Sequence, residues 1–142
     1  MKLITALEAA SEGHEHLDIE IQKLRGVRKP IPPYTRSVDA ALSLLPEGWS
    51  VYSLRRQTNG RGEFTSWAVV LYRATDVMIE VAHASKAVSA PLAICAAALR
   101  VRQRDDAAEA CAEHHARVTR HVEEVVSSDR RISAQAVRQR AF

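Results

Sequence analysis

The residues of this sequence that could do chemistry are its histidines, its two cysteines and a few clustered arginines. Five of the six histidines form two groups: His14 and His16, and His114, His115 and His121. Neither H-E-x-x-H nor C-x-x-C occurs, and Arg117 shares a helical face with two of these histidines, where its charge would repel a bound cation. We therefore expect solvated or packed histidines, with no bound metal and no cofactor.

The sequence also lacks the motifs by which enzymes bind nucleotides. The phosphate-binding patterns G-x-x-x-x-G-K-[ST] and G-x-G-x-x-G are both absent. Gly60-Arg61-Gly62 alone is more typical of a flexible hairpin tip. We expect no catalytic residue, and hence a protein that is not an enzyme.

The candidate binding residues are arginines and aromatic residues in the middle of the chain. They are Arg55, Arg56, Arg61, Trp67 and Tyr72. The arginines could contact phosphates. The two aromatic residues fall on opposite faces of an expected strand, so one of them could be exposed and stack on a base or a small ring. The alternatives are a solvated basic face and aromatic side chains packed in the core.

Length and composition limit the class of protein. The chain has 142 residues, 46% of them apolar, and a formal net charge of +3. These proportions are typical of one globular domain. Glu8 interrupts the apolar start, so no signal peptide is expected, and no apolar run approaches the ~20 residues of a membrane span. We expect a cytoplasmic protein that does not contact a membrane.

Local signals divide the first third of the chain. Apolar spacing predicts helices over 3–10 and 17–24, separated at Gly13 and stopped at Gly26. The proline-rich stretch 29–33 is expected to be a rigid connector. Ser37 is the expected N-cap of a short helix over 38–45, which ends at 46–48.

The period then changes to two, which predicts strands over 49–54, 65–73 and 77–81. Residues 55–63 contain Asn59-Gly60 and are expected to form a turn or hairpin loop. The strand over 65–73 has Trp67, Val69 and Leu71 on one face.

Pro91 suits the first turn of a further helix. Beyond it, apolar residues recur at alternating spacings of three and four: Ala108, Cys111, His115, Val118, Val122 and Val125. This seam is either an oligomer interface, giving a dimer or small even-numbered assembly, or the inner face of a helix packed on its own domain. One helix over 91–126 and two helices broken at Asp105-Asp106 are both compatible with the pattern. Ser127-Ser128 is the expected end, and 132–142 a weakly patterned tail.

These elements predict an α+β fold with a helix–three-stranded antiparallel sheet–helix sandwich core. We divide the chain into an N-terminal helical segment, 1–29, the α-β-β-β-α core, 33–102, and a C-terminal helical extension and tail, 103–142.

Two stretches of this core resemble a known family. Residues 33–49 read P-Y-T-x-S-x-D-A-A-L-x-x-x-P-E-G-W, and residues 90–100 read A-P-L-A-I-C-A-A-A-L-R. Together they resemble the phage ABA sandwich domain, found in small proteins of phages and prophages. The resemblance spans residues 1 to about 102 and implies helix–sheet–helix layering. Residues 103–142 run past the usual end of that domain, and loop 57–64 is longer than usual.

The resemblance implies no activity, only a phage or prophage origin and the cytoplasm of a host cell as the location. Through that origin, the resemblance implies a role that small accessory phage proteins often have, which is to blunt host defence by binding a host protein or a small nucleotide signal. We expect a non-enzymatic binding module of that kind. The alternative is a nucleic-acid-binding accessory protein that uses the basic hairpin.

Overall fold

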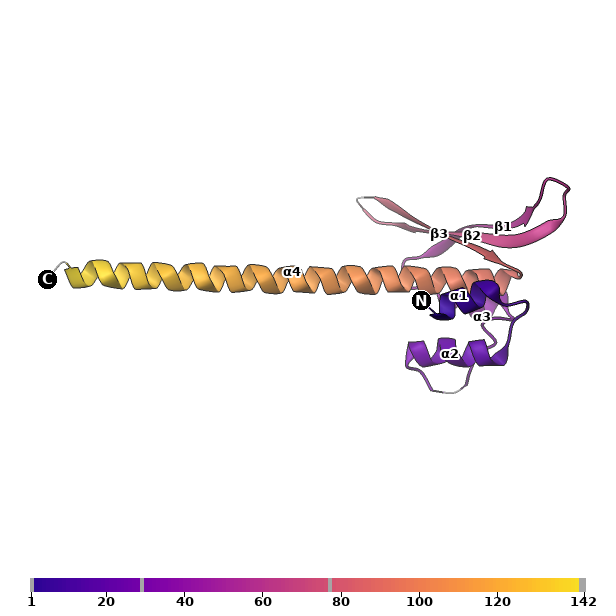
Figure 1. Cartoon of the computed structure of the whole chain (residues 1–142), viewed down its shortest axis with the longest axis horizontal. Coiled ribbons are helices and arrows are strands. Elements are labelled where there is room, and N and C mark those ends of the chain that lie inside the picture. Colours follow the sequence, from indigo (N-terminus) through magenta and orange to yellow (C-terminus); the bar gives the residue numbers. More distant parts are fainter. Residues whose placement is uncertain (1, 29, 77, 141–142) are drawn as a thin grey trace. The chain divides into compact units, whose positions relative to one another are not determined.

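The computed structural model describes residues 2–28, 30–76 and 78–140, and within these ranges the side chains of all but 83–86, 129, 132–134 and 136–140. The elements along the chain are α1 (Lys2–Ala9), α2 (Glu15–Arg25), α3 (Val38–Leu42), β1 (Ser50–Thr58), β2 (Phe64–Ala74), β3 (Ile79–Ala87) and α4 (Ala90–Arg140). The expected α+β class, with N-terminal helices, a three-stranded antiparallel sheet and a long C-terminal helix, is confirmed (Figure 1).

The helix boundaries in the first third follow the local signals. Gly26 ends α2 in the left-handed conformation, at φ 65°, and its N–H donates to the carbonyl oxygen of Lys23. The hydroxyl of Ser37 accepts from the N–H of Ala40 and caps α3, as expected. α3 is shorter than the sequence predicts, because turns follow Leu42 where a helix to residue 45 was expected.

The sheet has the order β1-β2-β3, with both neighbouring pairs antiparallel. The expectation that residues 55–63 form a loop is wrong for its first part. Arg55 and Arg56 belong to β1, which continues to Thr58 because each residue pairs with one in β2. β3 begins at Ile79; Val77, expected to begin this strand, lies outside the described residues.

The long C-terminal helix is a single element. α4 runs from Ala90 to Arg140 without a break at Asp105-Asp106. The expectation that it ends at Ser127-Ser128 is wrong, because helical structure continues for a further three turns. By its contacts the chain divides into two compact units, Met1–Gln103 and Arg104–Phe142. Within the described residues, no helix combines the length and apolarity needed to cross a bilayer.

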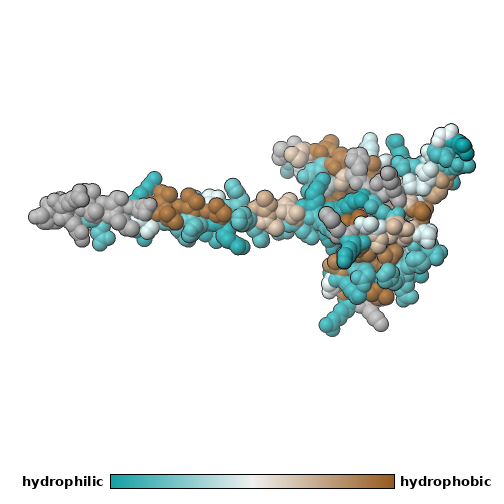
Figure 2. All heavy atoms as spheres, in the orientation of Figure 1, coloured by the Kyte–Doolittle hydropathy of each residue, from teal (hydrophilic) through white to brown (hydrophobic). Residues whose placement is uncertain are grey.

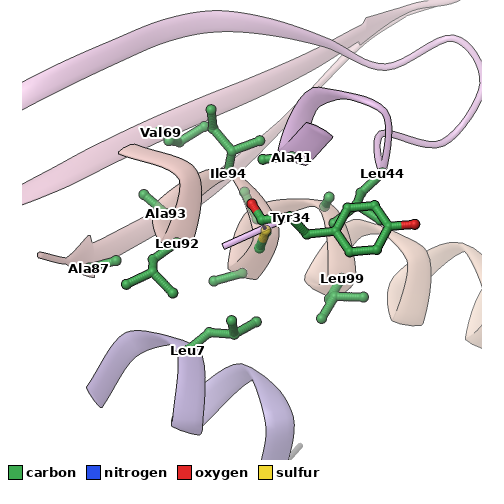
Figure 3. Packing of buried hydrophobic residues seen from close by; sticks show 14 of the residues in the cluster. Leu7, Tyr34, Ala41, Leu44, Val69, Ala87, Leu92, Ala93, Ile94 and Leu99 are labelled. Carbon is green, nitrogen blue, oxygen red and sulfur yellow. Dashed lines mark hydrogen bonds between the residues drawn. The ribbon is translucent and has the colours of Figure 1, made fainter. Parts of the chain in front are cut away.

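The start of α4 is the centre of the first unit. Every residue from Leu92 to Ala98 is at most 1% exposed, so this stretch is covered on all sides. Figure 3 shows how: Val69 of β2 and Ala41 of α3 lie on one side of Ile94, and Leu7 of α1 lies on the other side of the helix. The ion pair between Arg100 and Glu8, at 2.7 Å, joins α4 to α1 at the rim of this core.

This arrangement leaves one face of the sheet open. In Figure 1 the described helices of the first unit lie on the same side of the three strands. Val69 and Leu71 of β2 point to that side and are fully buried. The residues that alternate with them, Val70 and Tyr72, point to the other side.

Candidate interaction surfaces

The open face of the sheet carries a hollow of about 950 Å³. Residues of all three strands line it: Val51, Tyr52, Ser53, Arg55, Gln57, Ala68, Val70, Tyr72, Ile79 and Val81. Most of these side chains are apolar or aromatic. We call this surface the open sheet face. In Figure 2 the space-filling view is brown over the β2–β3 end of the sheet.

Several apolar residues of the open sheet face are strongly exposed. Tyr52 and Ile79 are each 72% exposed and Val81 is 46% exposed. β-Branched and aromatic side chains favour strands, where they usually lie on a face of the sheet that the core covers. A group of them left in solvent is typical of a surface that receives a partner.

A β-bulge in β1 brings the aromatic residues of the open sheet face together. Val51 pairs with Leu71 and Ser53 pairs with Val70, which leaves Tyr52 as an extra residue between them. The ring of Tyr52 then meets the ring of Tyr72 edge to face, with centroids 6.0 Å apart and planes at 78°. Two tyrosines in contact offer a rigid aromatic platform with two hydroxyl groups.

The five predicted binding residues do not form one site. Arg55 and Tyr72 line the open sheet face. Arg56 pairs with Trp67 across the strands and so lies on the opposite face, where its guanidinium stands 4.9 Å from the centroid of the Phe64 ring. Phe64 and Trp67 are themselves 6.5 Å apart. The prediction that Trp67 and Tyr72 point to opposite faces is confirmed.

Arg61 lies apart from both faces, in the turn between β1 and β2. The side chain of Asn59 fixes this turn, because its Oδ1 accepts from the N–H groups of Arg61 and Glu63. Gly62 takes the left-handed conformation there, at φ 78°. The turn is therefore ordered by its own hydrogen bonds, and the three arginines present their charges in three different directions.

The predicted oligomer interface lies in the second unit. Ala108, Cys111, His115, Val118, Val122 and Val125 are all exposed on α4. We call this row of six residues the helix stripe. Figure 2 shows a hydrophobic band part of the way along this helix. The alternative, that the stripe packs on its own domain, stays a prediction.

A buried polar network near the start of the chain was missed by the sequence reasoning. Asp18 is 1% exposed and accepts hydrogen bonds from Thr35 and Arg36. The hydroxyl of Tyr34 donates to Gln22 at 2.6 Å and accepts from Arg25 at 2.7 Å. Among the residues described, every buried side-chain nitrogen or oxygen has a partner. A fully satisfied network of this kind fixes the connector on α2 and leaves no group aimed at a ligand.

The polar side chains that line the open sheet face belong to arginine, glutamine, serine and tyrosine. The described side chains that line the open sheet face include no carboxylate, histidine or thiol. The part of the chain that is described also holds no cluster of three or more histidine, cysteine, aspartate or glutamate residues placed to ligate a metal. Cys95 is buried, and burial raises the pKa of its thiol, which keeps it in the unreactive protonated form.

Comparison of the chain with protein-family models, with curated proteins and with solved structures finds no match. The properties of the two surfaces therefore rest on their own residues.

Proposed function

We propose that this protein is a non-enzymatic binding module of phage or prophage origin, acting in the host cytoplasm, which holds a partner protein on its open sheet face. The observation that carries the proposal is the exposure of Tyr52, Ile79 and Val81 together on one uncovered side of the sheet. Covering such residues removes apolar surface from water and favours association.

A protein partner fits this surface better than a small nucleotide does. Pockets for small ligands are enclosed and bury most of the ligand. The open sheet face is shallow, and two of its lining residues, Tyr52 and Ile79, remain 72% exposed. An apolar centre with a few polar groups at its margin, here Arg55 and Gln57, is the usual composition of a protein–protein contact.

The origin in a phage or prophage and a role in blunting host defence rest on the resemblance of residues 33–49 and 90–100 to the phage domain. Within that role, the partner we propose is a host protein. The nucleic-acid alternative has weaker support, because Arg55, Arg56 and Arg61 do not share a face.

Site-specific photo-cross-linking tests the proposal. A benzophenone amino acid replaces Tyr52 or Val81 in the full chain, which is made in its bacterial host, and Lys23, exposed on α2, is the control position. We expect a discrete protein adduct from the two sheet positions and not from Lys23. The purified partner should then bind Ile79→Asp at least about tenfold more weakly than the parent chain.

Two results would count against the proposal. One is cross-linking that is equal at the sheet positions and at Lys23, or absent at all three. The other is an adduct removed by nuclease treatment, which would favour the nucleic-acid alternative.

A further inference from the structure

The helix stripe is an apolar surface separate from the open sheet face. Val118, Val122 and Val125 are 47%, 54% and 48% exposed, and their spacings of four and three place them in one row along α4. An isolated helix gains nothing from such a row in water. It becomes favourable when a second helix covers it.

The residues beside the stripe permit a close approach by another helix. In a heptad with Ala108 at position a, the flanking e and g positions hold no acid, lysine or arginine from residue 107 to residue 128. They are occupied by Ala107, Ala112, His114, Thr119, His121, Val126 and Ser128. Between residues 107 and 128 the acids and arginines lie on the remaining b, c and f positions, so the face around the stripe holds none of them.

The order of the charges selects the occupant and its direction. Along the second unit, acids over 105–113 are followed by Arg117 and Arg120, then by acids at 123–124 and at Asp129, then by arginines at 130–131. When the helix is turned end for end about Arg120, Glu123 falls opposite Arg117 and Arg131 falls opposite Glu109. Arg120 falls opposite its own copy, at an f position away from the stripe. Helices that pair on this pattern attract when antiparallel.

We propose that two copies of this chain pair through the helix stripe in an antiparallel arrangement centred on Arg120. In this register Val118 of one copy lies opposite Val122 of the other, and His115 lies opposite Val125. At the margins, Arg117 of one copy comes beside Glu124 of the other, and Glu109 comes beside Arg130, so each pair joins opposite charges. A parallel, in-register pair would place each of these side chains beside its own kind.

Self-association itself is tested by sedimentation velocity on the full chain at concentrations between about 1 and 200 μM. In this range a weakly associating helix pair changes from mostly monomer to mostly dimer. We expect a concentration-dependent dimer. Val122→Asp places a charge in the stripe and should abolish the dimer. Ser127→Asp adds the same charge at an f position on the opposite face and should leave it intact. A parent chain that is monomeric throughout, or equal effects of the two substitutions, would overturn the proposal.

Disulfide trapping tests the direction. In a Cys111→Ser background, His115→Cys and Val125→Cys variants of different tagged size are mixed and oxidised. The antiparallel register predicts mixed dimers only, because two copies of position 115 are then separated by ten residues, about 15 Å along the helix, and a disulfide requires Cα atoms within about 7 Å. Like-with-like dimers would overturn the antiparallel arrangement.

Charge reversal tests the pairing at the margins. Arg117→Glu should weaken association about two- to fivefold, the range of exposed ion pairs, and Glu124→Arg in the same chain should restore it. A double variant that is weaker than either single variant would overturn the register. Failure of these experiments leaves the proposed function untouched, because the open sheet face belongs to the first unit and is probed by its own cross-links.

Discussion

The carboxylate of Asp18 in α2 accepts two hydrogen bonds from Thr35, a residue 17 positions further along the chain. The backbone N–H of Thr35 donates to Oδ1 of Asp18 at 2.7 Å and its hydroxyl donates to the same atom at 2.8 Å. Oδ2 accepts from Arg36 at 3.0 Å. Because Asp18 and Thr35 are both buried, their contact fixes the connector after α2 and so the position at which α3 begins.

Replacing Asp18 with alanine should destabilise the fold by about 3 kcal/mol. The substitution leaves the buried N–H of Thr35 without an acceptor and leaves its hydroxyl only the longer contact to the carbonyl oxygen of His14, at 3.3 Å. An unsatisfied buried N–H carries a large desolvation cost. Urea unfolding measures the change. Arg36→Ala should cost about 1 kcal/mol or less, because that side chain is half exposed. Equal costs for the two variants would contradict a dominant role for the buried hydrogen bonds.

Gly13→Ala should lower stability by about 2 kcal/mol or more. A Cβ built on Gly13 would lie 2.3 Å from the carbonyl oxygen of Thr35, and a backbone atom held by the Asp18 contact cannot move aside cheaply. Gly60→Ala is the matched control, since nothing lies within 4 Å of the added atom. Thermal unfolding should show a clear loss of Tm for the first variant and almost none for the second. A neutral Gly13→Ala would mean that the segment between α1 and α2 can shift.

Only one of the two cysteines should react in the native protein. Cys95 is buried, its thiol donates to the carbonyl oxygen of Tyr34 at 3.3 Å, and burial raises its pKa, with a smaller contribution from Asp18. Since the thiolate is the reacting form, Cys95 stays unreactive at a pH of about 8 while exposed Cys111 is modified. A thiol-reactive dye should count one group in the folded chain and two in denaturant.

The Cys111→Ser variant is the control for this count and should show no reactive thiol until it is unfolded. Rapid labelling of Cys95 in that variant would show that the start of α4 opens readily. The masses of peptides from a digest of the labelled chain identify which cysteine has been modified.

The parts of the fold that the sequence predicts are those governed by short-range signals. The break at Gly13, the stop at Gly26 and the cap at Ser37 each depend on one residue and its neighbours, and all three are found. Period-two alternation alone predicts that Val69 and Leu71 share one face of their strand, and both are buried there.

The parts that the sequence does not predict depend on distant partners. The sequence pattern places Arg55 and Arg56 in the loop that contains Asn59-Gly60, yet they pair with Ala68 and Trp67 and belong to β1. Ser127 and Ser128 read as a stop, but serine in an exposed helix costs only a few tenths of a kcal/mol, and α4 continues to Arg140. β2 has apolar residues on both faces, such as Val69 and Val70. The sequence pattern therefore does not predict which face of the sheet is open.

The candidate sites divide in the same way. The helix stripe could be predicted because its spacing is a property of one continuous helix, and all six of its members lie on α4. The open sheet face could not be predicted, because it combines Tyr52, moved by a bulge, with Ile79 and Val81 of another strand. Asp18 gives no local signal at all, since its partners come from a connector 17 residues away.

The last prediction concerns the basic hairpin and separates the two proposed classes of partner. Arg55 lies on the open sheet face, Arg56 on the opposite face over Phe64, and Arg61 in the turn, so they do not form one basic face for a phosphate backbone. We expect the parent chain to bind generic RNA or DNA weakly, with a shallow salt dependence. At a dedicated site the affinity would fall steeply with salt. In a plot of log affinity against log salt concentration, the slope would be roughly one for each phosphate contact.

Fluorescence anisotropy at several salt concentrations, with the parent chain and with each single Arg→Ala variant, measures this slope. If the arginines act as separate solvated charges, no single variant should change the slope by more than a few tenths. A parent slope near three that falls by about one in each variant would instead mean that the three guanidinium groups engage one nucleic acid together. That result would replace the protein partner of the open sheet face with a nucleic acid bound around the β1–β2 hairpin.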